Sequence, residues 1–189
     1  PTCRTVDNAD RQLEKVMAEA DCLHTEADVE AAIERMAREI SAALRQSDPL
    51  VYCVMNGGLV FAGRLVLRLD FPLQIGYLHA SRYQGATQGG ELHWRVPPAD
   101  SLQGRTVLVV DDILDEGTTL GAIVEACRAR GAARVHTAVL VEKRHARRPP
   151  GLHSDFIGLQ VEDRYVFGFG MDYREYWRNA PGIFAVRGS

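Results

Sequence analysis

Several acidic side chains lie close together near the middle of the chain, and a glycine and two threonines follow them. The acids are Asp111, Asp112, Asp115 and Glu116, and the segment Gly117-Thr118-Thr119 comes next. Clustered carboxylates can bind a metal, hold sugar hydroxyls or transfer a proton. Backbone N–H groups at the start of a helix bind anions such as phosphate. Together these residues indicate an anion site beside carboxylates that could serve any of these three purposes.

The elements on either side of these acids would place them at a ligand-binding edge. Residues 107–110 form an apolar, β-prone run typical of a buried parallel strand, and a helical pattern follows up to Gly131. Ligands of open α/β sheets bind at the carboxyl ends of the strands, which is where the acids lie. The plainer interpretation is an ordinary strand, turn and helix with acidic surface residues.

The rest of the chain alternates between strand and helix patterns. This alternation predicts an α/β fold with a right-handed, mostly parallel sheet flanked by helices. Thr25 and Asp28 form a potential capping box at the start of a helix. The predicted strands are 50–55, 71–79, 107–110, 135–141, 156–161, 165–169 and 183–186, and the alternating residues 91–96 could include a hairpin strand. The predicted helices are 7–20, 29–44, 59–69 and 118–130.

Length and composition indicate one ordinary globular domain that spans residues 1–189. The net charge of −3 and the lack of a long Lys/Arg block argue against a nucleic-acid partner. The one basic cluster, residues 143–148, is expected to be mostly a solvated loop. No apolar stretch resembles a signal peptide or a membrane span, so we expect a cytoplasmic protein without a membrane partner.

Cysteine and histidine spacing gives no sign of a metal centre. The four cysteines, Cys3, Cys22, Cys53 and Cys127, are scattered, which favours reduced thiols over disulfides or zinc ligands. The six histidines show neither metal-ligand spacing nor the arrangement of a catalytic triad, and the sequence assigns them no role.

The segment from residue 107 to Thr119 resembles the phosphoribosyl pyrophosphate motif of type I phosphoribosyltransferases. Four hydrophobic residues, two acids, two apolar residues and then Asp-x-Gly-x-Thr follow the family pattern closely. The resemblance implies a sheet core of about residues 45–150. It also implies a small hood subdomain built from the N-terminal segment and about residues 151–189.

The resemblance also implies roles for the residues of this motif. Asp111 and Asp112 would bind the ribose hydroxyls and order a magnesium ion, and Asp115 would act as general acid/base beside the purine. The backbone of residues 115–119 would hold the 5′-phosphate, with help from the hydroxyls of Thr118 and Thr119. Glu116 stands where the family usually has Ser or Thr, so its side chain must turn away from the phosphate.

Within this family the chain is most similar to the hypoxanthine-guanine phosphoribosyltransferases, from about residue 50 to residue 186. Asn56 and Gly57 lie in a loop that resembles the family's pyrophosphate loop, in which a cis peptide would join Met55 to Asn56. Ser81 and Tyr83 resemble the pair on the family's mobile catalytic loop. The plainer alternatives are a tight turn for the first segment and a surface hairpin for the second, and composition alone favours the plainer alternative only for the second.

The remaining site residues come from the same resemblance. Lys143 would donate to the 6-oxo group of the purine, Tyr165 would stack on the base, and the Val166 backbone would bond its edge. Asp172 would help to hold magnesium, and Arg178 would contact pyrophosphate. Without the resemblance, Lys143 and Arg178 would be assigned to the solvated surface.

The resemblance implies purine salvage. The 5-phosphoribosyl group of phosphoribosyl pyrophosphate would pass to hypoxanthine or guanine, giving IMP or GMP and pyrophosphate, with Mg²⁺ held by Asp111, Asp112 and Asp172. The partners would be these small molecules and further copies of the chain in a homodimer or homotetramer. The alternatives are a xanthine-preferring enzyme and a non-catalytic regulator that senses the same precursor and binds RNA or DNA.

Overall fold

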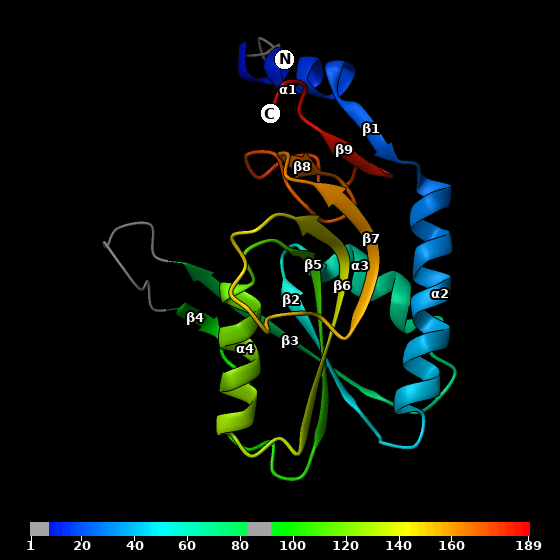
Figure 1. Ribbon diagram of the computed structural model, residues 1–189, viewed down its shortest axis with the longest axis vertical. Coiled ribbons are helices and arrows are strands. Elements are labelled where there is room, and N and C mark those ends of the chain that lie inside the picture. The colour runs from blue at the N-terminus through cyan, green and yellow to red at the C-terminus, as the bar shows by residue number, and fades with distance from the viewer. Residues whose placement is uncertain (1–7, 83–91) are drawn as a thin grey trace, which may run out of the picture.

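A six-stranded sheet forms the centre of the molecule (Figure 1). The computed structural model describes residues 8–82 and 92–189. The strand order is β4-β3-β2-β5-β6-β7; all neighbours are parallel except β3 and β4. The predicted mostly parallel α/β sheet is therefore confirmed. The strands are β2 (Leu50–Met55), β3 (Gln74–Arg82), β4 (Leu92–Val96), β5 (Thr106–Leu114), β6 (Arg134–Arg144) and β7 (Phe156–Glu162).

Helices cover both faces of this sheet. Along β5, Leu108 and Val110 pack with α2 (Glu26–Leu44) and α3 (Gly58–Val66), whereas Val107 and Val109 pack with α4 (Thr118–Ala129). Successive side chains of a strand point to opposite faces, so a strand covered on both faces is a continuous apolar run. This explains why residues 107–110 are uniformly apolar and fully buried.

The predicted capping box starts α2. The Asp28 amide donates to Thr25 Oγ1 at 3.3 Å, and the Thr25 amide donates to Asp28 Oδ2 at 2.8 Å. These two bonds satisfy N–H groups that have no partner within the helix. Beyond the cap, apolar residues at helical spacing form the face that packs on the sheet; they include Val29, Ile33, Met36 and Ile40.

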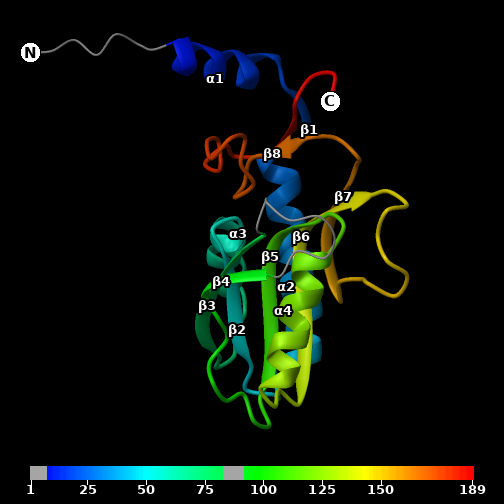
Figure 2. The same cartoon turned by 90° about the vertical axis from the view of Figure 1, so that its left-hand side faces the viewer.

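A smaller sheet lies above the carboxyl ends of the central strands (Figures 1 and 2). Its antiparallel order is β1 (Asp21–His24), β9 (Ile183–Ala185) and β8 (Val166–Phe167), so it joins the two ends of the chain. Helix α1 (Asn8–Glu19) leads into it, and Trp177 Nε1 donates to the Leu13 carbonyl at 3.0 Å. Strand β1 was not predicted, because four residues are too few to show an alternating pattern.

Three strands extend further than the sequence predicted, because ladder pairing continues past the apolar runs. Ser81, expected in a loop, lies in β3 opposite His93 of β4. Lys143, expected just after a strand, lies in β6 opposite Val161, and β5 continues through the acids to Leu114. Tyr83 and the rest of residues 83–91 lie outside the described residues. In the part of the chain that the structure describes, no helix is long and apolar enough to cross a membrane.

Candidate active site

A cavity of about 310 Å³ opens where the carboxyl ends of β2 and β5 meet the start of α4. Asn56 and Gly57 line it from the loop after β2, and Arg178 lines it from the C-terminal segment. The motif that runs from the end of β5 into α4 supplies the remaining polar lining, namely Asp111, Asp112, Asp115, Glu116, Gly117 and Thr119. The structure therefore brings the acids, the predicted pyrophosphate loop and the predicted pyrophosphate arginine together.

Two glycines allow the backbone segments around this cavity to approach one another. A Cβ atom on Gly57 would lie 2.0 Å from Asp112 Oδ2, and a Cβ atom on Gly170 would lie 2.0 Å from the Gly57 carbonyl oxygen. A larger residue at Gly170 would collide with the Gly57 backbone, and a larger residue at Gly57 would displace the Asp112 carboxylate. The peptide bond between Met55 and Asn56 is cis, as the resemblance implied. The loop after β2 is therefore built for close backbone approach to the acids and to the smaller sheet.

Asp111 and Asp112 form an acidic pair at the base of the cavity. The Asp112 amide donates to Asp111 Oδ1 at 2.9 Å, and the Ile113 amide donates to Asp112 Oδ1 at 2.9 Å. Burial raises the pKa of Asp111 well above its ordinary value, and the neighbouring charge of Asp112 raises it further. Burial also raises the pKa of Asp112, although Arg178 opposes the shift. A cation beside this pair would stabilise both carboxylates in their charged form.

The donor atoms at the acidic pair fit Mg²⁺, which prefers oxygen ligands and usually combines one or two carboxylates with water and substrate phosphate. Asp172, the third predicted ligand, lies at a smaller adjoining cavity and pairs with Arg178 at 2.8 Å. Among the described residues, these three carboxylates do not form a close cluster of their own. They could hold a magnesium ion together with a phosphate-bearing substrate, but they are not a closed cage.

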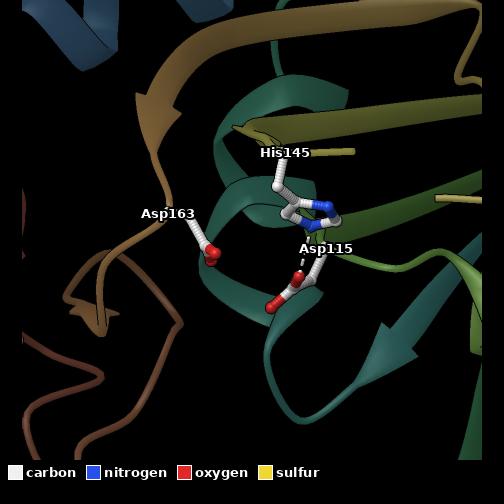
Figure 3. Close-up of side chains that lie close together, drawn as sticks. All are labelled: Asp115, His145 and Asp163. Carbon is white, nitrogen blue, oxygen red and sulfur yellow. Dashed lines mark hydrogen bonds and ion pairs between the residues drawn. The ribbon is translucent and has the colours of Figure 1, made fainter. Parts of the chain in front are cut away.

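Asp115, three residues beyond the pair, has the opposite electrostatic setting (Figure 3). Lys143 Nζ lies 2.9 Å from Asp115 Oδ2, and His145 Nε2 lies 2.7 Å from Asp115 Oδ1. Partial burial by itself would raise the pKa of Asp115, but the hydrogen bonds from Lys143 and His145 outweigh it and the pKa lies below its ordinary value. Asp115 is therefore ionised at neutral pH.

Asp115, His145 and Asp163 lie close enough to share a metal ion (Figure 3). However, the carboxylate oxygens of Asp115 and Asp163 already form ion pairs with cationic side chains. Arg147 binds both carboxylate oxygens of Asp163, and Lys143 binds Asp115. A cation added here would face two positive charges, so we interpret this group as an ion-pair network rather than a metal centre.

The phosphate loop leads directly into α4. Gly117 is the N-cap with φ of 81°, and a Cβ atom there would lie 1.8 Å from Leu152 Cδ2, so only glycine fits. Thr119 lines the cavity, whereas Thr118 is exposed and is not among the described lining residues. The Glu116 carboxylate lies 3.8 Å from Arg147 Nε, which places a positive charge beside the unusual acid of this loop.

The predicted purine residues line the smaller cavity of about 190 Å³. Tyr165 is 46% exposed, and the Tyr165 and Tyr173 rings meet edge to face with their centroids 5.6 Å apart. This cavity shares Asp112, Ile113 and Asp115 with the larger one, so the two cavities adjoin at these residues. The predicted residues brought together here are Lys143, Tyr165, Val166 and Asp172.

The prediction that residues 143–148 are mostly solvated holds for Arg144, Ala146 and Arg147, which are exposed, but not for His145 and Arg148. The Arg148 side chain is only 16% exposed and donates to the carbonyl oxygens of Asp115, at 3.1 Å, and Lys143, at 2.8 Å. His145, to which the sequence assigned no role, contacts Asp115 directly. The contacts of His145 and Arg148 with Asp115 join residues 30 and 33 positions apart, so spacing could not reveal them. Ser81 is not among the described residues that line either cavity.

The comparisons with known proteins agree with this geometry. The phosphoribosyl transferase domain model matches residues 19–175. A hypoxanthine-guanine phosphoribosyltransferase of Bacillus subtilis is 31% identical, covering 87% of this chain and 92% of the relative. A hypoxanthine-guanine-xanthine phosphoribosyltransferase of Tritrichomonas foetus is 30% identical, covering 88% and 91%.

Solved structures give the same result. A hypoxanthine phosphoribosyltransferase from Staphylococcus aureus superposes with a TM-score of 0.84 at 26% identity, covering 90% of this chain and 94% of that one. The Trypanosoma cruzi enzyme in complex with the product IMP superposes with a TM-score of 0.82 at 25% identity, covering 90% and 96%. The chain therefore belongs to the type I phosphoribosyltransferases, as an enzyme of the hypoxanthine-guanine phosphoribosyltransferase family.

Proposed function

We propose that this enzyme transfers the 5-phosphoribosyl group of phosphoribosyl pyrophosphate to nitrogen 9 of hypoxanthine or guanine. The products are IMP or GMP and pyrophosphate. The observation that carries this proposal is the junction of the two cavities at Asp112 and Asp115. A ribose at this junction would have its phosphates beside the α4 N-terminus and Arg178, and its reacting carbon beside a purine on Tyr165.

On the phosphoribosyl side, backbone N–H groups at the start of α4 hold the 5′-phosphate. Asn56, Gly57 and Arg178 hold pyrophosphate, for which a guanidinium offers paired donors. Asp111 and Asp112 bind the ribose hydroxyls and, with Asp172, hold Mg²⁺. When bound, the ion neutralises charge on the leaving pyrophosphate. The predicted closure of a loop carrying Ser81 and Tyr83 over this site stays a prediction.

On the purine side, the proposed contacts select an oxo-purine. Lys143 donates to the 6-oxo group, which adenine replaces with an amine that is itself a donor. Tyr165 stacks on the ring, and the Val166 backbone bonds its edge. The backbone carbonyl of Asp172 would accept from a 2-amino group, which would favour guanine.

Asp115 acts beside purine nitrogen 7. Breaking the bond to pyrophosphate leaves positive charge on the sugar, and bond formation then places charge on the base. A carboxylate held in its charged form stabilises both better than it stabilises the neutral substrates. Because the pKa of Asp115 lies below its ordinary value, we propose that electrostatic stabilisation is its larger role and proton transfer the smaller one.

The test is pyrophosphate release from phosphoribosyl pyrophosphate with Mg²⁺, with hypoxanthine, guanine, xanthine, adenine and uracil offered separately. Turnover with hypoxanthine or guanine but not with adenine or uracil supports the proposal. Faster turnover with xanthine than with either would support the xanthine-preferring alternative, and xanthine does appear in the name of the Tritrichomonas foetus relative. Precursor binding without turnover of any base would favour a regulator and contradict the proposal.

We also propose that the chain assembles as a homodimer or homotetramer. A groove of about 280 Å³ between α3 and the outer part of the sheet is lined mostly by apolar residues. Three large side chains there stay exposed, Leu59 at 53%, Ile75 at 63% and Tyr77 at 52%. An Ile75→Lys protein should sediment as a smaller species than the wild type. The cytoplasmic location stays a prediction.

A further inference from the structure

His145 has an unusual environment for a residue outside the predicted site. It follows β6 directly, and its side chain is only 5% exposed. Its ring points at the Asp115 carboxylate (Figure 3), with Nε2 2.7 Å from Oδ1. Lys143 contacts the other oxygen, Oδ2, at 2.9 Å. Both oxygens of the carboxylate beside the purine cavity are therefore held by side chains of this chain.

The second ring nitrogen fixes which atom of His145 carries the proton. The backbone N–H of Arg147 donates to His145 Nδ1 at 3.2 Å. A backbone N–H can only donate, so Nδ1 must accept. In the neutral ring the proton then lies on Nε2, which donates to Asp115. The loop backbone thus makes His145 a fixed hydrogen-bond donor to the carboxylate.

Neighbouring ion pairs hold the loop that carries His145. The Arg147 guanidinium binds both oxygens of Asp163, at the end of β7, and Arg148 binds Glu142 at 2.6 Å. Arg148 also donates to the carbonyl oxygens of Asp115 and Lys143. The residues on the C-terminal side of His145 are therefore tied both to the motif and to the segment that precedes Tyr165.

We propose that His145 is a positioning residue that keeps the Asp115 carboxylate oriented and ionised while a purine is bound. This inference rests on the proposed function. Lys143 would share the three N–H donors of its ammonium group between Asp115 Oδ2 and the 6-oxo group of the base. When the base draws Lys143 away, His145 still holds Oδ1, so the carboxylate keeps its direction toward nitrogen 7. A side chain without a donor at this place would let the carboxylate rotate.

Two substitutions separate this role from simple packing. His145→Gln keeps an N–H donor near the Nε2 position, whereas His145→Leu keeps the bulk and removes the donor. His153→Leu serves as the matched control, because His153 is exposed on the same connection and contacts the Gly151 carbonyl rather than Asp115. Circular dichroism and thermal unfolding verify that each variant folds.

The kinetic test uses the single-turnover rate with hypoxanthine and saturating phosphoribosyl pyrophosphate. His145→Leu should lower this rate about tenfold, the loss of one charge-assisted hydrogen bond, and leave the KM for phosphoribosyl pyrophosphate within about twofold. His145→Gln and His153→Leu should stay within about threefold of wild type. Adding His145→Leu to Asp115→Asn should have little further effect, since His145 acts through Asp115.

A second readout does not depend on turnover. Carboxyl ¹³C NMR should show the pKa of Asp115 raised in His145→Leu and near the wild-type value in His145→Gln. The inference is overturned if His145→Leu leaves the pKa of Asp115 unchanged, or if the Leu and Gln variants lose the same activity. A wild-type protein that is inactive with every base, yet shows the pKa response, would contradict the proposed function and leave the His145–Asp115 contact supported.

Discussion

Two groups of carboxylates only three residues apart have opposite electrostatic settings. Asp111 is buried beside Asp112, and the pKa of Asp111 lies well above its ordinary value because of burial and its acidic neighbour. Asp115 is about 40% exposed and contacts Lys143 and His145, so its pKa lies below its ordinary value. The difference arises because β6 and the loop after it supply donors to Asp115, while the acidic pair lies deeper, near β2.

The two groups therefore differ in the cations and hydrogen-bond donors that they still require from a substrate or a metal ion. Lys143 and His145 already contact both oxygens of Asp115, which is ready as a charged group before substrate arrives. The charge of Arg178 lowers the pKa of Asp112 in the acidic pair. An added cation or hydroxyl donors would stabilise the ionised form of the pair further. Pairs of carboxylates whose pKa values are pushed apart commonly have distinct roles in one reaction. The following substitutions test whether the acidic pair and Asp115 have distinct roles.

The largest effect is expected from Asp115→Asn, which removes the charge but keeps the shape. We expect kcat to fall by a factor on the order of 10²–10⁴, because the substituted amide stabilises neither the cationic sugar nor the base. Steady-state kinetics with hypoxanthine measure it. Asp70→Asn, on an exposed loop that lines neither site cavity, should leave kcat unchanged. Nearly full turnover by Asp115→Asn would remove Asp115 from the mechanism.

The second-largest effect is expected from substitution of Lys143, which donates a hydrogen bond to Asp115. Lys143→Met should lower kcat/KM for hypoxanthine about ten- to a hundredfold, the loss of a charged hydrogen bond of about 1.5–3 kcal/mol. It should also raise the pKa of Asp115. Arg144→Met is the matched control, because Arg144 is the next residue of β6 and bonds Gln160 instead. Equal losses in the two variants would contradict the role of Lys143.

Asp111→Asn should increase stability while it weakens substrate binding. The folded-state pKa of Asp111 is raised above 3.8, so ionisation opposes folding increasingly as the pH rises above that value. Replacing the carboxylate should therefore stabilise the protein by roughly 0.5–2 kcal/mol at pH 7.5 and by less at pH 4.5. Urea unfolding at the two pH values measures the difference. A variant less stable than wild type at pH 7.5 would show that the ionised Asp111 carboxylate does not oppose folding.

The smallest effect is expected at the phosphate loop. Glu116→Thr removes a negative charge beside the 5′-phosphate and restores the hydroxyl typical of the family. With about 1 kcal/mol of repulsion relieved, the KM for phosphoribosyl pyrophosphate should fall about fivefold. Glu125→Thr, on the exposed face of α4 where Glu125 pairs with Arg128, should leave the KM unchanged. A higher KM in Glu116→Thr would show that the Glu116–Arg147 contact assists binding.

The sequence predicted the parts of the site that follow one another along the chain. Residues 107–119 form the expected strand, turn and helix, because burial on both faces requires the apolar run and Gly117 fits a position that only glycine can occupy. Lys143 and Tyr165 reach the same cavity as the family resemblance implied. Their roles in the reaction stay predictions.

The contacts around Asp115 could not be predicted, because they depend on how separate loops fold back. His145 and Arg148 reach Asp115 from 30 and 33 positions away, and a basic run normally lies in solvent. The length of β3, which includes Ser81, depends on pairing with β4 rather than on apolar pattern. Strand β1 was missed because its four residues gain their structure from β9.

The proposed division of roles requires that the pKa of Asp111 is raised and the pKa of Asp115 is lowered. Its most direct test is a pH titration of the Asp111 and Asp115 carboxyl carbons by ¹³C NMR, with and without Mg²⁺ and phosphoribosyl pyrophosphate. The account predicts that Asp115 titrates below its ordinary pKa in both conditions. Asp111 should titrate above its ordinary pKa alone and at a lower pH when the ligands are bound. Ordinary pKa values for both, or ligands that shift only Asp115, would contradict the account.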